Sequence, residues 1–120
     1  MKFGENARFG ELAHIAAVFG STIKAGCNLM ASRMVSIFAG DGHPIFDESS
    51  ELLNGGERIV MGDWIWCGTK STILGDCSLG NQVIIGANSV VSGNHCMDNI
   101  ALAGNPAHVV KHGIKWDYQV

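Results

Sequence analysis

Apolar residues recur at every sixth position through much of the second half of the chain. Stepping by six from Met61 to Ala103 meets only apolar side chains, and five of the eight residues that follow them are glycine. The stepped positions are Met61, Cys67, Ile73, Leu79, Ile85, Val91, Met97 and Ala103. Neither a helix with 3.6 residues per turn nor an alternating strand repeats with this period. The pattern predicts short strands joined by tight corners, three strands to a coil, with the first residue of each hexad stacked inside. A glycine beside that position is expected to supply the positive φ of the corner.

The period continues upstream with two shifts of register. The set Phe3, Phe9 and Ile15 keeps a spacing of six, and the set Ile23, Leu29 and Val35 keeps it after a shift of two residues. A second shift precedes Met61, and the segment 39–58 before it is rich in glycine, asparagine, serine and aspartate. Because such residues form turns, we expect coils over 3–38 and 59–104 with a protruding loop at 39–58.

The repeat fails near the C-terminus, around Ser92–Asn94. An open coil end is an exposed sheet edge, so the segment 108–120 is expected to cap it, with Val109–Tyr118 folding over the last coil as a short helix or an extended tail. The predicted fold is therefore one all-β domain over residues 1–120. It is a left-handed parallel β-helix of hexapeptide repeats with an inserted loop and a C-terminal capping segment.

Composition narrows the classes of function. A net charge of -3 at pH 7 gives no basic surface for nucleic acid. No apolar run approaches the roughly 18 residues of a membrane span, and the first residues have no apolar stretch typical of a secretory signal. The four cysteines include no CxxC pair, which favours reduced thiols in a cytoplasmic protein.

His43 is the natural candidate for a general base. Its imidazole titrates near ~6.5 when unperturbed, and either Asp41 or Asp47 is close enough in sequence to orient the ring. Spacing alone favours the plainer interpretation, an exposed histidine in a turn.

Other chemically interesting side chains have plain interpretations as well. Cys67 falls on an interior position, which favours a small buried hydrophobe over a nucleophile. Trp64 and Trp66 flank an interior position and should point outward, toward a subunit interface or a ligand. His108 and His112 would share one face if the tail were helical, but two surface histidines are favoured over a metal site, since no third ligand is near.

Four motifs carry a resemblance to a known family. In order, they are Asp41–Asp47, Met61–Gly68, Ile85–Val91 and Ala103–Ala107. Together they resemble the hexapeptide-repeat acetyltransferases, most closely the O-acetyltransferases of polysaccharide and capsule biosynthesis. The tail Val109–Trp116 is similar to that branch too. The resemblance implies a homotrimer with acetyl-CoA as co-substrate in the cleft between neighbouring prisms, and no metal.

The resemblance also implies roles for individual residues. His43 matches the catalytic histidine of the family, which reverses the interpretation from spacing. Asp41 is named with it as a catalytic residue, and either Asp41 or Asp47 can orient the ring. Trp66 matches an aromatic residue of the active site. The other positions implied in cofactor binding are Thr69, Gly86, Ala87, Asn105, Pro106, His108 and Lys111. The implied reaction moves an acetyl group from the thioester to a hydroxyl of a sugar or polysaccharide precursor.

Three alternatives remain open at this point. A serine or xenobiotic acetyltransferase would keep the chemistry and change the acceptor. A catalytically degenerate β-helix would keep the fold alone. A γ-class carbonic anhydrase shares the fold but needs three converging histidines, and His43 has no histidine close by in sequence.

Overall fold

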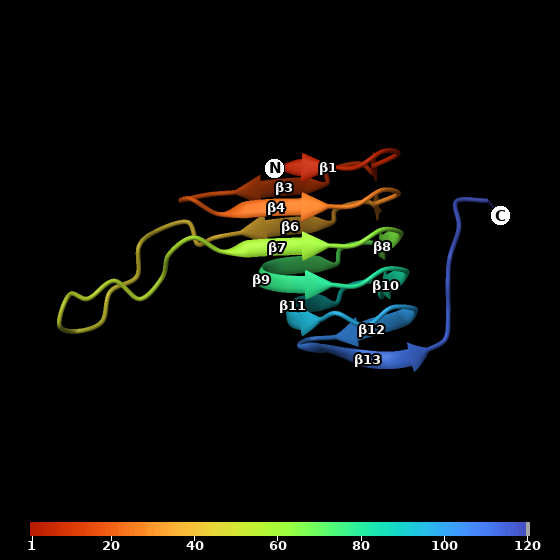
Figure 1. The fold of residues 1–120 in the computed structure, drawn as a ribbon. Helices are drawn as coiled ribbons and strands as arrows, with labels where there is room; N and C mark the ends of the chain where they lie inside the picture. The colour runs from red at the N-terminus through yellow and green to blue at the C-terminus, as the bar shows by residue number, and fades with distance from the viewer. Residues whose placement is uncertain (120) are drawn as a thin grey trace.

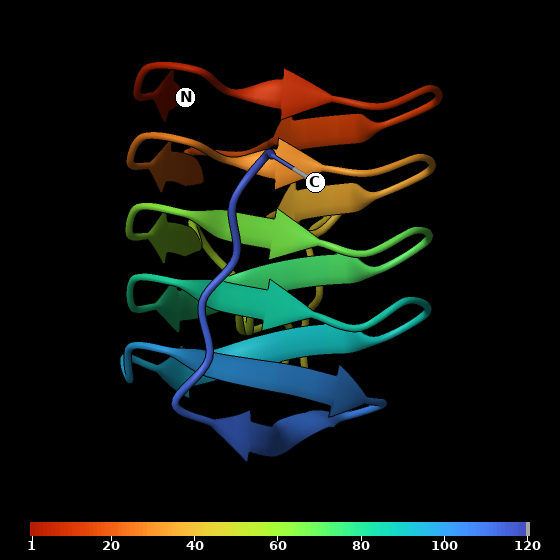
Figure 2. The same cartoon turned by 90° about the vertical axis from the view of Figure 1, so that its right-hand side faces the viewer.

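The computed structural model describes residues 1–119, and all of its regular secondary structure is strand. The strands wind into a three-sided prism (Figure 1). Front strands run left to right in Figure 1, and the next face runs left to right when seen from the right-hand side in Figure 2. The chain therefore descends as a left-handed coil, which confirms the predicted fold class.

Each coil contributes one short strand to each face. The first coil contains β1 (Lys2–Phe3), β2 (Arg8–Phe9) and β3 (His14–Ala17), and the second contains β4 (Thr22–Ala25), β5 (Met30–Ala31) and β6 (Ser36–Ala39). The later coils contain β7 (Arg58–Met61), β8 (Ile65–Cys67), β9 (Thr72–Leu79), β10 (Val83–Ile85), β11 (Val90–His95), β12 (Ile100–Gly104) and β13 (Ala107–His112). Strands β9 and β11 each bend from one face onto the next. The start of β9 pairs with β6 and its end pairs with β7, and β11 pairs with both parts of β9.

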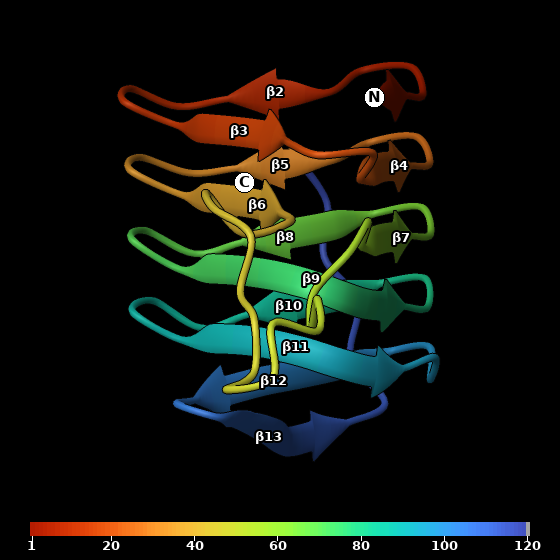
Figure 3. The ribbon, with the colours of Figure 1, turned by 90° about the vertical axis from the view of Figure 1, so that its left-hand side faces the viewer.

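Three faces and three corners follow from this pairing. The β7 face holds β1, β4, β7 and the ends of β9 and β11. The β8 face holds β2, β5, β8, β10, β12 and β13. The β6 face holds β3, β6 and the starts of β9 and β11. The β7–β8 and β8–β9 corners are tight turns, whereas a long insertion leaves the β6–β7 corner in the second coil (Figure 3).

The core is the stack of interior positions that the period of six predicts. The predicted residues from Ile23 to Val91 are almost completely buried: Ile23, Leu29, Val35, Met61, Cys67, Ile73, Leu79, Ile85 and Val91. Each fully buried aliphatic side chain contributes about 1.5–3 kcal/mol relative to an exposed one. At the N-terminal end Phe9 is 46% exposed, and its ring lies 5.5 Å from that of Phe3, so these two rings cover the end of the stack.

The predicted register is wrong beyond Val91. Met97 is 50% exposed, and Leu102 is buried in place of Ala103. A bulge lies between Val91 and Gly93, and Ile85 pairs with Leu102, 17 residues on, whereas Cys67 pairs with Ile85, 18 residues on. This coil is therefore one residue shorter than the one before it, so each later interior position lies one residue earlier in the sequence than predicted.

The expected reason for the glycines holds at Gly104, whose φ is 105°, and is wrong at Gly62, Gly68, Gly80 and Gly86. Positive φ falls two residues after them, at Trp64, Lys70, Gln82 and Asn88. A Cβ at Gly68 would lie 2.7 Å from the carbonyl oxygen of Ile85 in the next coil. The glycines are needed because the backbones of successive coils approach closely there, and the left-handed residue that makes the corner follows them.

The C-terminal segment divides into two parts. Strand β13 pairs antiparallel with β12 and closes the last coil, as predicted, and it takes the extended form of the two that were expected. Residues 113–119 then turn back and run along the β8 face to the first coil (Figure 2), where the Tyr118 hydroxyl donates to the carbonyl of Asn6 at 2.8 Å. This second part, called the strap below, does not cover the last coil, so the expectation was wrong there. No helix within residues 1–119 is long and apolar enough to span a membrane.

Candidate active site

The insertion predicted at 39–58 forms an arm of residues 40–57, because Ala39 ends β6 and Arg58 begins β7. It projects from the prism as a narrow double-stranded loop (Figure 1). A bridge between Phe46 and Leu52 joins its two limbs, and the Leu53 amide donates to the carbonyl of Ile45 at 2.7 Å. The arm therefore has a defined backbone of its own.

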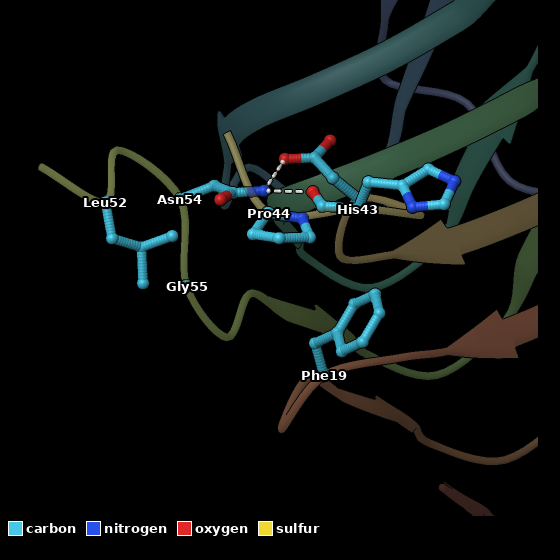
Figure 4. A pocket seen from close by; sticks show the side chains of 7 residues that line it. Phe19, His43, Pro44, Leu52, Asn54 and Gly55 are labelled. Carbon is cyan, nitrogen blue, oxygen red and sulfur yellow. Dashed lines mark hydrogen bonds between the residues drawn. The ribbon is translucent and has the colours of Figure 1, made fainter. Parts of the chain in front are cut away.

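His43 lies on the first limb of the arm and lines a hollow of about 240 Å³ with Phe19, Pro44 and Leu52 (Figure 4). Its side chain is exposed. The backbone at His43 is held by Asn54 on the opposite limb, whose side-chain amide donates to the His43 carbonyl at 3.0 Å. The same amide donates to Asp41 at 2.9 Å, and its oxygen accepts from the Ile45 amide at 2.8 Å.

Asn54 belongs to the candidate site but was not predicted from the sequence. It precedes Gly55 and Gly56, so its only sequence signal was that of a turn former. Its three hydrogen bonds, to the Asp41 carboxylate, the His43 carbonyl and the Ile45 amide, connect the two limbs around His43 where they leave the prism.

The two candidate partner carboxylates have different surroundings. Asp47 accepts the amides of Ser49 and Glu51 at 2.8 and 3.0 Å, which closes the turn at the arm's tip. Asp41 shares Asn54 with the His43 backbone. Within residues 1–119, neither carboxylate is hydrogen-bonded to the His43 ring. Burial, aided by the charges of Asp41 and Asp76, raises the pKa of the Glu57 carboxyl at the base of the arm.

The cofactor residues taken from the family resemblance gather along one corner. Thr69 and Ala87 occupy the β8–β9 corner in successive coils, where the Asn88 amide donates to the Thr69 carbonyl at 3.0 Å. The Gly86 amide donates to the carbonyl of Leu102 at 2.8 Å in the coil below. Asn105 and Pro106 form the turn from β12 to β13 at the same corner.

His108 and Lys111 both lie on β13, with exposed side chains. His108 pairs with Ala103, next to the turn, whereas Lys111 pairs with Ala101, about 10 Å further along the strand at ~3.4 Å per residue. The possible helical pairing of His108 with His112 was wrong, since both belong to a strand. Within residues 1–119, His, Cys, Asp and Glu side chains form no group of three that suits a metal ion.

His43 and the cofactor corner are apart within one chain. The arm leaves the corner between β6 and β7, and Thr69 lies on the corner between β8 and β9, with the β6 face between them (Figure 3). The structure thus brings Thr69, Gly86, Ala87, Asn105 and Pro106 together at one corner but separates them from the predicted base.

Both tryptophans lie outside the core, as predicted, and both contact the strap. The ring of Trp64 packs edge-on against Trp116 at 5.3 Å, and the Trp116 indole N–H donates to the Trp64 carbonyl at 2.7 Å. Trp66 stays 39% exposed on the β8 face, and its indole N–H donates to the Ser32 hydroxyl at 3.2 Å. Of the two, Trp66 therefore presents the more accessible ring.

Cys67 is a core residue, as predicted. It is completely buried, and burial raises the pKa of its thiol to about 12. Burial does the same for Cys77, and all four cysteines are free thiols. Because the thiolate is the reactive form, neither buried cysteine suits nucleophilic catalysis.

Comparison with known proteins identifies relatives over most of the chain, although no family model matches it. WbbJ of Escherichia coli (strain K12), which carries the name lipopolysaccharide biosynthesis O-acetyl transferase, is 31% identical over 120 residues, covering 91% of this chain and 59% of that protein. The polysialic acid O-acetyltransferase of Escherichia coli O1:K1 / APEC is 35% identical over 95 residues, covering 78% of this chain and 31% of that protein.

A solved structure agrees with these relatives. The polySia specific acetyltransferase NeuO superposes with a TM-score of 0.86 at 30% identity, covering 98% of this chain and 50% of that chain. The chain thus spans less than two thirds of each of these three proteins. The left-handed coil, the inserted arm and these similarities together show that the chain belongs to the hexapeptide-repeat acetyltransferase family, in the branch of the polysaccharide O-acetyltransferases.

Proposed function

We propose that this chain is the β-helix of a CoA-dependent O-acetyltransferase that acetylates a hydroxyl of a sugar or polysaccharide precursor. The observation that carries the proposal is the alignment of Thr69, Ala87 and Asn105 along one open corner, together with a histidine held on a separate arm. The names of the relatives, which refer to lipopolysaccharide and polysialic acid, support a carbohydrate acceptor.

The chemistry is a direct transfer with His43 as general base. The neutral imidazole takes the hydroxyl proton as the oxygen attacks the thioester carbonyl, so a C–O bond forms. When the tetrahedral intermediate collapses, the C–S bond breaks and the imidazolium returns the proton to the departing CoA sulfur. The oxyanion needs donors already in place, and the Thr69 hydroxyl and backbone N–H groups of the corner are of the right type. Asn54 positions the His43 backbone, and the same side-chain amide also donates to the Asp41 carboxylate.

Acetyl-CoA is assigned to the β8–β9 corner. The pantetheine arm would follow the backbone at Gly86 and Ala87, and the nucleotide would lie near the turn at Asn105 and Pro106. His108 lies two residues after this turn and is the nearer cation for the phosphates, while Lys111 would reach them with its longer side chain. Trp66 would form a wall close to the thioester.

The proposal requires a second copy of the chain, because base and cofactor corner do not meet within one prism. We assign a homotrimer, in which the arm of one copy reaches the cofactor corner of its neighbour. Four large apolar side chains on the arm support this, since each is about half exposed: Ile45, Phe46, Leu52 and Leu53. Exposed apolar clusters of this kind commonly mark protein contacts. Sedimentation should give a trimer, and a stable monomer near 12.7 kDa would contradict the assembly.

A cytoplasmic location fits this role. Acetyl-CoA is made inside cells, and free thiols such as Cys67 and Cys77 persist in reducing compartments.

The test of the base is His43→Ala. Its side chain is exposed on the arm, so the fold and CoA affinity should be unchanged while acetyl transfer falls roughly 10²–10⁴-fold, the usual contribution of a general base. His112→Ala, an exposed histidine on β13, is the matched control and should retain full activity. Transfer by His43→Ala at the parent rate would refute the mechanism, and failure of the parent to bind CoA would favour the degenerate β-helix. Serine should be tested as an acceptor in the same assay, because its acetylation would favour the serine acetyltransferase alternative over a carbohydrate acceptor.

A further inference from the structure

The strap is fastened along the β7–β8 corner at every coil. Near its start, the Asn99 side-chain amide donates to the Ile114 carbonyl at 3.0 Å, and further on Gln82 accepts the Trp116 amide at 2.9 Å. The remaining contacts go to the three earlier coils, at the carbonyls of Trp64, Leu29 and Asn6. The strap therefore forms a raised ridge that crosses in front of the β8 face (Figure 2), called the wall below.

A groove of about 440 Å³ lies between this wall and the β8 face. The residues whose side chains matter below are Arg8, Ser32, Trp66, Trp116, Asp117 and Tyr118. The rings of Trp66 and Trp116 lie 6.0 Å apart, and those of Trp116 and Tyr118 lie 5.1 Å apart, so the groove is lined by a continuous run of aromatic rings.

Two charged groups accompany the rings. The Arg8 guanidinium lies 3.7 Å from the centre of the Tyr118 ring, which fixes its plane. Within residues 1–119 Arg8 forms no ion pair, since the salt bridge there joins Arg33 to Glu11. The Asp117 carboxylate accepts the Gln119 amide at 3.2 Å and keeps further acceptor capacity.

This combination suits a sugar. A pyranose has apolar C–H faces that pack on aromatic rings, and hydroxyl edges that need both donors and acceptors. Tryptophan and tyrosine supply apolar area with a polar edge, and Arg8 and Asp117 supply a fork of donors and an acceptor. A cavity of this size falls in the usual range for small-molecule sites.

We propose that this groove binds a sugar ring of the acceptor, stacked on the indoles and hydrogen-bonded through Arg8 and Asp117. The inference rests on the proposed function, because it names the acceptor site of that reaction. Trp66 would then be the boundary between the two substrates, with the thioester on one side and the sugar on the other. The C-terminal strap would form part of the site as well as holding the coils together.

Intrinsic fluorescence reports on this groove selectively, because all three tryptophans of the chain, Trp64, Trp66 and Trp116, belong to the cluster. The probes are maltohexaose, a neutral glucose oligomer, and a sialic acid oligomer, an acidic one. We expect a saturable change in tryptophan fluorescence with at least one, matched by calorimetry. If only the acidic oligomer binds, Arg8 recognises its carboxylate. If both oligomers bind, Arg8 recognises the hydroxyl groups that they share.

Arg8→Ala and Asp117→Ala should each weaken sugar binding about tenfold or more, since each removes hydrogen bonds to a charged group. Both side chains are exposed, so the fold should survive. Lys115→Ala, an exposed change within the strap but outside the groove, is the matched control and should bind as the parent does.

The outcomes separate this inference from the proposed function. Unchanged sugar affinity in both groove variants, or no response to either oligomer, would overturn the sugar site even if acetyl transfer proceeds. Sugar binding that depends on Arg8 in a protein that never transfers acetyl groups would support the groove and contradict the proposed reaction.

Discussion

Replacing Asn54 with alanine removes the three hydrogen bonds that join the limbs of the arm around His43. A hydrogen bond contributes about 0.5–1.5 kcal/mol net to stability. Because Asn54 is only half buried, the lower half of this range applies, and the three bonds together contribute about 1.5–3 kcal/mol. This free energy would be lost from the ordered arm, so acetyl transfer should fall about 10–100-fold. The unfolding free energy of the prism should change little, because the arm opens locally.

The assay combines turnover with hydrogen exchange. Amides of the arm, those of Ile45 and Leu53 above all, should exchange faster in Asn54→Ala, while amides of β8 and β10 should not. Asn54→Asp keeps the acceptor for the Ile45 amide but loses the donor and places a second negative charge beside Asp41, so it should be no better than alanine. Ser49→Ala at the tip is the control and should behave as the parent. Unchanged turnover together with unchanged exchange in Asn54→Ala would refute the positioning role.

Two further predictions concern the prism. Gly68→Ala places a Cβ 2.7 Å from the carbonyl of Ile85, so urea unfolding should show a loss of about 1–3 kcal/mol, whereas Gly42→Ala, with open space around it, should show little loss; equal stability of the two variants would contradict the close-approach explanation. Burial raises the thiol pKa of Cys67 and Cys77 from 9.0 to about 12 in the folded protein. As the pH rises, the unfolded chain therefore loses these protons before the folded one does. The unfolding free energy should not be reduced by these thiols below pH 9, and it should fall between pH 9 and 12. Iodoacetamide at pH 8 should modify the exposed Cys96 but not Cys67 or Cys77 until the protein is unfolded, as read by mass spectrometry, and early modification of Cys67 would contradict its burial.

The fold was predictable because one side-chain periodicity determines it. Interior positions from Ile23 to Val91 follow the period of six, and the bounds of the arm were found to within a residue from its turn formers. The period fails beyond Val91 because a bulge and a coil of 17 residues displace Met97 and Ala103, and hydropathy alone carries no signal for a lost residue. The role of most repeat glycines was predicted wrongly, since the close approach of successive coils, as at Gly68, is visible only in three dimensions.

The geometry of the candidate site was predictable only in part. The corner that gathers Thr69, Ala87 and Asn105 follows from the repeat, once the strands are aligned. Asn54 and the strap were not predictable, because both depend on hydrogen bonds between distant segments, such as Trp116 with Trp64. The separation of His43 from the cofactor corner likewise became evident only with the strands in place.

The central claim is that the arm of one copy completes the cofactor corner of the next. The direct measurement mixes two inactive variants, His43→Ala and a variant whose corner is blocked, Ala87→Trp, after unfolding and refolding them together in equal amounts. Each shared site then has one chance in two of an intact arm and one in two of an intact corner, so a closed ring should recover about one quarter of the parent activity. Each variant refolded alone should stay inactive. A mixture no more active than its components, with trimers formed and CoA still bound by His43→Ala, would contradict a site shared between copies.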